Sequence, residues 1–246
     1  MRKAFTYMEI VLVIVLIAIF ATVLKFANKD DDRLHLATLQ VLEHIRYTQH
    51  LAMSDNKFDP KENRYKYTPD SDGVASFGKY YKGWWQIRFV KQFNGEPKIV
   101  GYSVYSDFDR EGNIDLATTV NPAINPADGF RMTTYLRQPL KSPEDVENSV
   151  SKKMNIYTEY GIIDIKLSGG CSRAGFTRVT SGNIGSIAFD EKGRPYYGIS
   201  NDSKNNPFKF KLNSECDLSF TADTNKTATI RIYPESGYAE ILNIEQ

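Results

Sequence analysis

Residues 33–56 of the chain read RLHLATLQVLEHIRYTQHLAMSDN. Small or apolar side chains recur here every three or four residues, at Leu34, Ala37, Val41, Ile45, Thr48 and Ala52. This spacing is typical of an amphipathic helix, so we predict a helix from about residue 33 to Ser54 with that stripe packed on the domain. His35 and His44 fall on opposite sides of such a helix, which predicts solvated or structural histidines rather than a shared metal site.

Upstream of this helix lies a long apolar run, in which residues 10–24 read IVLVIVLIAIFATVL. As a helix, residues 5–27 would be about 34 Å long, enough to cross a hydrocarbon core of about 30 Å. Arg2 and Lys3 precede the run, and such basic flanks stay in the cytoplasm. The sequence therefore predicts a single membrane span, with a cytoplasmic N-terminus and the rest of the chain on the opposite side of the membrane. The alternatives are a cleavable secretory signal and a plain signal anchor.

Glu9 is the unusual residue of this segment, because a carboxylate inside an apolar span is costly and marks a function. Residues 3–11, KAFTYMEIV, resemble the signature of type IV prepilins: a basic leader, a small residue, then Phe-Thr-x-x-Glu opening an apolar helix. The resemblance implies that a prepilin peptidase cleaves between Ala4 and Phe5 and methylates the new amine of Phe5. It also implies that Glu9 neutralises the Phe5 amine of a neighbouring subunit, so that both residues direct assembly. The same resemblance implies a single-pass protein of the bacterial inner membrane, with a cytoplasmic N-terminus and a periplasmic C-terminal domain.

Downstream of the helix, residues 55–83 are polar and predict a long loop, after which apolar and polar residues alternate in most segments. The alternation predicts strands at residues 85–89, 100–105, 163–167, 186–189, 194–199, 208–212, 230–232 and 238–242. A short helix is expected to open at Ser142. The predicted fold class is α+β: a long N-terminal helix with a membrane half and an amphipathic half, then a mostly antiparallel β-sheet domain. The domain limits are a leader at 1–4, a transmembrane helix at 5–27, its amphipathic continuation at 28–54 and a periplasmic β-rich domain at 55–246.

Four short elements of the sheet region are similar, in order, to those of H-type minor pseudopilins and FimT-like pilus-biogenesis proteins. They are residues 83–89 (GWWQIRF), 104–113 (VYSDFDREGN), 189–195 (FDEKGRP) and 230–237 (IRIYPESG). The resemblance implies a pilin-like fold and the role of a minor pseudopilin. Such a protein is a structural subunit of a type II secretion or type IV pilus-like filament, with other pseudopilins or pilins as partners through the N-terminal helix.

The alternative function is that of a DNA-binding minor pilin in a natural-transformation (DNA-uptake) machine. Uptake-type relatives carry basic residues near the C-terminus, whereas Tyr238-Ala239-Glu240 stands there in this chain. The formal net charge of +1 also provides no field that would attract DNA. DNA is therefore a candidate partner that the charge does not support.

An acidic loop supplies alternating oxygen donors, at Asp107, Asp109, Glu111, Asn113 and Asp115. Ca²⁺ binds about six to eight such oxygens, and Gly112 has the position of the sharp turn in a calcium loop. Thr118 stands where such a loop has its bidentate Glu. The alternative is a hairpin turn in which Asp and Asn cap their own backbone. Calcium is thus the one candidate cofactor, and no cofactor is certain.

Cys171 and Cys216 are the two cysteines of the chain, and both follow the predicted membrane span. An oxidising compartment would let them form a disulfide; the alternative is two free buried thiols. Ser168-Gly169-Gly170-Cys171 has no histidine nearby that could activate a nucleophile. A P-loop, an HExxH motif, a CxxC motif and a nucleophile elbow are also absent from the sequence. We therefore predict a structural subunit without catalytic residues, and a membrane-anchored enzyme is the remaining alternative.

Overall fold

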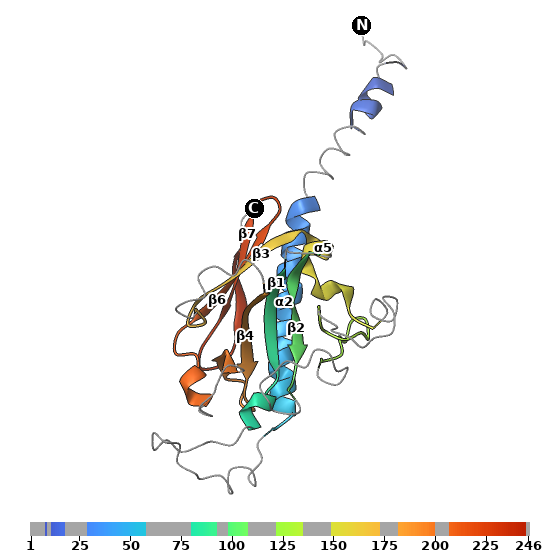
Figure 1. The fold of residues 1–246 in the computed structure, drawn as a ribbon. Helices are drawn as coiled ribbons and strands as arrows, with labels where there is room; N and C mark the ends of the chain where they lie inside the picture. Colours follow the sequence, from blue (N-terminus) through green and yellow to red (C-terminus); the bar gives the residue numbers. More distant parts are fainter. Residues whose placement is uncertain are drawn as a thin grey trace, which may run out of the picture.

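The structure is a computed structural model of the 246-residue chain. It describes residue 8 and the ranges 11–17, 29–57, 80–92, 98–107, 122–134, 149–172, 182–199 and 207–244. Within these ranges, helix α2 (Lys29–Ser54) is followed by eight strands and by short helical segments. Figure 1 shows α2, in blue, running along the strands.

The eight strands form two antiparallel sheets of four strands each. The first sheet has the order β2-β1-β4-β5, with strands Ile99–Tyr105, Gln86–Gln92, Gly182–Phe189 and Pro195–Tyr197. The second sheet has the order β3-β6-β7-β8, with strands Ile162–Gly169, Cys216–Ala222, Thr227–Ile232 and Ala239–Ile244. The short helices are η1 (Tyr80–Gly83), η2 (Lys152–Met154), α5 (Ile156–Tyr160) and η4 (Pro207–Phe210).

Helix α2 buries the stripe of side chains that its spacing predicts. The six residues of the stripe, Leu34, Ala37, Val41, Ile45, Thr48 and Ala52, are each at most 3% exposed. Its five apolar members share one core with both sheets, because α2 contacts β1 and β4 of the first sheet and β7 and β8 of the second. Full burial of a Leu, Val or Ile side chain stabilises a fold by about 1.5–3 kcal/mol. The predicted helix is confirmed, and it begins at Lys29, a few residues earlier than expected.

Most of the predicted strands are confirmed, and one is wrong. The segment 208–212 contributes to η4 rather than to a strand. Pro207 lacks the N–H group that a sheet ladder needs, and Phe208 is 53% exposed, so the alternation there does not mark a buried face. Strand β6 is missing from the prediction, although its side chains alternate between buried and half-buried. The helix start expected at Ser142 and residues 58–79 of the expected loop lie outside the described residues.

The predicted pilin-like α+β fold, one long N-terminal helix followed by one sheet domain, is wrong. The structure has the 26-residue helix α2 and two separate four-stranded sheets, and the described residues include no long apolar N-terminal helix. The sequence pattern could not show this, because alternation identifies strands without specifying which strands pair. Here β1 pairs with both β2 and β4, and β4 pairs with β5, while β3 pairs with β6, which lies more than forty residues further along the chain.

The predicted single-pass localisation in the inner membrane is contradicted as well. No helix in the part of the chain that the structure describes is long and apolar enough to cross a membrane. Of the expected span 5–27, the structure describes residue 8 and residues 11–17.

Candidate functional site at the C-terminal end of helix α2

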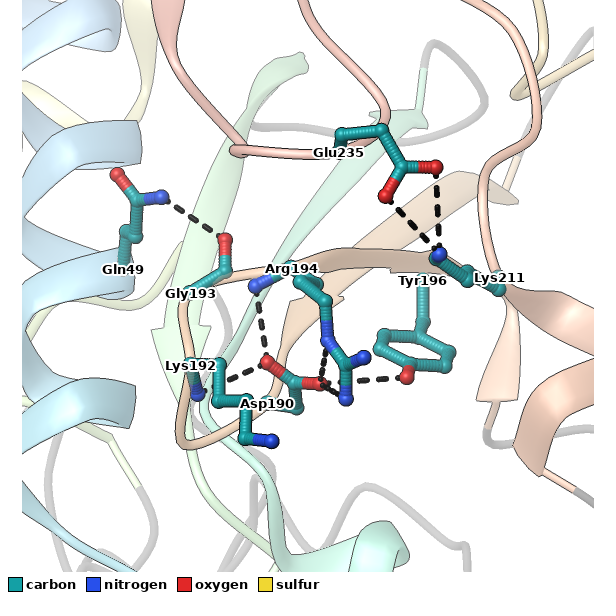
Figure 2. A network of polar contacts seen from close by, with 8 residues as sticks. All are labelled: Gln49, Asp190, Lys192, Gly193, Arg194, Tyr196, Lys211 and Glu235. Atoms are coloured by element: carbon teal, nitrogen blue, oxygen red, sulfur yellow. Dashed lines mark hydrogen bonds and ion pairs between the residues drawn. The ribbon is translucent and has the colours of Figure 1, made fainter.

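Two turns from different sheets meet at the C-terminal end of α2. One turn follows β4 and leads into β5, and the other follows β7 and leads into β8. Gln49 of α2 joins them, because its Nε2 donates hydrogen bonds to the carbonyl oxygens of Gly193 and Ser236, each at 2.8 Å. Figure 2 shows Gln49 beside the first turn. Trp84 packs close by, and the centroid of its ring lies 4.7 Å from that of Tyr196 in β5. Three of the sequence segments singled out above, residues 83–89, 189–195 and 230–237, thus converge here.

Asp190 is the centre of the first turn, and its side chain is 1% exposed. Its Oδ1 accepts hydrogen bonds from the backbone N–H groups of Lys192 and Arg194, both at 2.9 Å. Its Oδ2 accepts from Arg194 Nε at 2.7 Å and from the Tyr196 hydroxyl at 3.2 Å, and Arg194 Nη2 lies 2.7 Å away. Figure 2 shows these donors around the one carboxylate. Charge-assisted bonds of this kind offset the desolvation of a buried charge.

The local sequence explains why this turn forms. An Asp at the start of a turn caps backbone N–H groups two residues on, and a Gly adopts the left-handed conformation at no steric cost. Gly193 has a φ of +76°, and its N–H donates to the Asp190 carbonyl oxygen at 2.9 Å. The Asp190 N–H in turn donates to the Arg194 carbonyl oxygen at 3.1 Å. The turn is therefore closed by both backbone and side-chain bonds.

The charged groups of this turn stabilise its conformation rather than transfer protons. The hydrogen bond to Asp190 raises the pKa of the Arg194 guanidinium. Burial, together with the Asp190 charge, raises the pKa of the Tyr196 hydroxyl. Both groups therefore keep their protons at neutral pH and remain donors. Because the Asp190 oxygens already accept from five donor atoms, the carboxylate is occupied in fixing the turn.

The second turn approaches the first so closely that glycine is required. Gly237 has a φ of +65°, and a Cβ at this position would collide with the Gly193 carbonyl oxygen and the Gln49 amide. At the rim, Lys211 Nζ pairs with Glu235 at 3.2 Å (Figure 2). We call Gln49, Asp190, Gly193, Arg194 and Gly237 the turn lock. It fixes this end of α2 to both sheets. The two turns belong to segments that stand out in the sequence, residues 189–195 and 230–237, whereas no periodicity distinguishes Gln49 from other polar residues of the helix.

Cys171 and Cys216 form a disulfide, and both side chains are fully buried. The bond joins the turn after β3 to the first residue of β6. Pairing of these strands places Gly169 opposite Cys216, so Cys171, two residues later, lies within reach. The disulfide therefore crosslinks two neighbouring strands of the second sheet.

The other predicted site residues are described in part or not at all. Asp107 lies two residues beyond the end of β2 and is 2% exposed. The remaining donors of the candidate calcium loop, Asp109, Glu111, Asn113 and Asp115, lie outside the described residues, as do Ala4, Phe5 and Glu9 of the processing and assembly motif. Among the residues that the structure describes, no group of three or more His, Cys, Asp and Glu side chains could hold a metal ion.

A second polar network involves the buried face of α2. His44 is 8% exposed, and its Nδ1 lies 2.7 Å from the Tyr102 hydroxyl. Gln40 Nε2 donates to the same hydroxyl at 2.8 Å, and Gln40 Oε1 accepts from the Tyr160 hydroxyl at 2.7 Å. Because Tyr102 accepts from Gln40, its own proton is available to His44, which suits a neutral imidazole. Burial lowers the pKa of His44 to about 4; the Asp128 charge opposes this shift and Lys153 adds to it.

We expect His44 to make the fold sensitive to mild acid. The unfolded chain binds a proton at His44 below about pH 6.5, whereas the folded chain binds it only near pH 4. The unfolded state therefore holds more protons in this window, and stability falls by about 3 kcal/mol as the pH drops from about 6.5 to about 4. Urea unfolding at several pH values should show this decline in the wild type.

The His44→Asn variant should lose that part of the decline, because its amide can still accept from Tyr102 but does not titrate. His50→Asn is the control, since His50 is exposed on the same helix. Parallel pH profiles of the wild type and His44→Asn would contradict the assignment.

The chain was compared with known protein families, curated proteins and solved structures. No family, no curated protein and no solved structure matches it.

Proposed function

We propose that the chain is a structural subunit of a filament of the pseudopilin kind, in a type II secretion or type IV pilus-like machine. A prepilin peptidase would cleave it between Ala4 and Phe5, and Phe5 and Glu9 would then direct assembly. The proposal rests on the N-terminal segment and requires no catalytic residue in the folded body.

The observation that carries the proposal is the exposure of residues 11–17. These seven consecutive apolar residues, VLVIVLI, are helical, and their side chains are between 40% and 62% exposed. In Figure 1 the helical segment lies beyond the N-terminal end of α2, apart from both sheets. Removal of apolar surface from water is favourable by about 25 cal/mol per Å², so contiguous exposed apolar side chains mark an interaction surface. Equivalent segments of several subunits, packed side by side, would cover one another.

The turn lock supports the same function mechanically. A filament subunit transmits force from its N-terminal segment to its body, so the helix that connects them must hold its position. Helix α2 contacts both sheets along its length, and Gln49 ties its last turns to both hairpins. Helix α2 and the two sheets are thus suited to move together as one rigid unit when force acts on the N-terminal segment.

Glu9 provides the test of the proposal. In an assembled filament its carboxylate would pair with the amine of a neighbouring Phe5, and a desolvated charge that loses its partner is strongly penalised. We expect the Glu9→Ala variant to be processed and folded like the wild type but to be missing from filaments. Co-sedimentation of the chain with the filament of its own machine measures this.

Glu43→Ala is the matched control, because Glu43 is an exposed carboxylate of α2 whose side chain is 64% exposed. It should enter filaments like the wild type. Incorporation of Glu9→Ala at the wild-type level would count against the proposal. Equal thermal midpoints of the two variants would show that loss of incorporation does not reflect misfolding.

A further inference from the structure

The face of the first sheet that points away from the main core is polar around β1. Side chains alternate between the two faces of a strand. Ile87 enters the main core, so Gln86 and Arg88 lie on the opposite face. The strand register places Ser103 of β2 and Ser186 of β4 directly beside Arg88. Small side chains therefore flank the arginine on both neighbouring strands.

Several polar atoms on this face lack a hydrogen-bond partner within the described part of the chain. They are Gln86 Oε1, Arg88 Nε, the Tyr105 hydroxyl and Thr134 Oγ1. Tyr105 lies opposite Gln86 in the register, and the Thr134 N–H donates to Ser103 Oγ at 3.3 Å, which places both beside Arg88. Gln86 is 2% exposed and Tyr105 is fully buried. Buried polar groups are nearly always hydrogen-bonded in native proteins, so this cluster points to a ligand.

Within the part of the chain that the structure describes, Arg88 also lacks an acidic partner. Arg194 and Arg231 each form ion pairs with an aspartate, whereas no carboxylate of the described residues pairs with Arg88. Arg88 is half-buried, and burial lowers the pKa of its guanidinium. An arginine nevertheless keeps its proton at any ordinary pH. This face therefore carries a positive charge that would attract an anion.

We propose that this face binds a small oxyanion, a carboxylate or a phosphate group, with the Arg88 guanidinium as its main ligand. The Tyr105 and Thr134 hydroxyls supply further donors, and Gln86 Oε1 accepts from a hydroxyl or a protonated oxygen of the same molecule. Burial raises the pKa of the Tyr105 hydroxyl, and the charge of the Asp107 carboxylate, beyond the end of β2, raises it further. A negative charge therefore already lies near this face and opposes a second charge on the bound anion. A singly charged anion is therefore favoured. This site is independent of the proposed filament function.

The test is thermal unfolding of the full chain in chloride buffer, and then with sodium acetate or inorganic phosphate at constant ionic strength. A ligand of the folded state raises the midpoint in a saturable way, and we expect this for the wild type. Arg88→Met should show no such shift. In chloride alone, Arg88→Met should be at least as stable as the wild type, because it removes a half-buried charge that no carboxylate of the described residues pairs with. Added anion should thus reverse the order of the two proteins.

Arg46→Met is the matched control, because Arg46 is an exposed arginine of α2 that pairs with Glu43, and it should keep the anion-dependent shift. Tyr105→Phe removes one donor and should weaken phosphate binding by about tenfold, as measured by phosphorus NMR. If Arg88→Met does not fold, Tyr105→Phe takes its place as the test variant. The proposal is overturned if neither anion shifts the wild type beyond chloride, as expected for buried water alone. It is also overturned if Arg88→Met keeps the shift.

Discussion

Replacement of Asp190 by alanine is expected to lower the free energy of unfolding by about 3–5 kcal/mol. The substitution leaves the guanidinium of Arg194 without its carboxylate, and it also removes the acceptor of two backbone N–H groups and of the Tyr196 hydroxyl. Urea unfolding followed by tryptophan fluorescence measures the effect. Trp84 is a suitable reporter because its ring packs on Tyr196.

Two variants control this experiment. Glu235→Ala removes a carboxylate of the same region whose side chain is 79% exposed, and an exposed pair of this kind contributes about 0–1 kcal/mol. Asp190→Asn keeps the shape but removes the charge, and it should fall between the other two. If Asp190→Ala and Glu235→Ala lowered the free energy of unfolding equally, the Asp190 hydrogen bonds of the turn lock would not stabilise the fold as their geometry indicates.

The second large effect is expected for the disulfide. The double variant C171A/C216A should lose about 4 kcal/mol, because the crosslink closes a loop with a sequence separation of 45 and thereby restricts the unfolded chain. Both cysteines are fully buried, so removal of the two sulfur atoms adds a packing loss. Urea unfolding of the wild type and of the variant under oxidising conditions measures the difference.

Reductant provides the internal control for this prediction. Wild-type protein in which the bond has been reduced should approach the stability of the double variant, and the double variant itself should not respond to reductant. A wild type whose urea midpoint is the same with and without reductant, with complete reduction shown by thiol counting, would contradict the expected contribution.

The sequence predicts those parts of the fold that depend on local periodicity. The stripe of α2 is specified by three- and four-residue spacing, and all six of its residues are buried as expected. The alternation in Gln86–Gln92 likewise marks a real strand with one face in the core. In these segments the burial of one face is the main determinant of structure, and this burial is visible in the order of the residues.

Other parts of the fold depend on contacts between distant residues, which the pattern does not record. Alternation at residues 208–212 is overridden by Pro207, and the division into two sheets depends on which strands pair. The disulfide was predicted from the compartment expected for the domain, whereas in the structure the two cysteines meet because β3 and β6 are neighbours. The turn lock could be located only as two turns, since the role of Gln49 requires both carbonyl groups to be in place.

The central claim is that the chain is a processed filament subunit, and the mass of the mature chain tests it most directly. Intact-mass and fragment spectra of protein isolated from its own cells give the first residue and its modification. The account predicts that residues 1–4 are absent and that the chain begins with an N-methylated Phe5. A chain that begins at Met1, or at a residue beyond the apolar run 10–24, would contradict it.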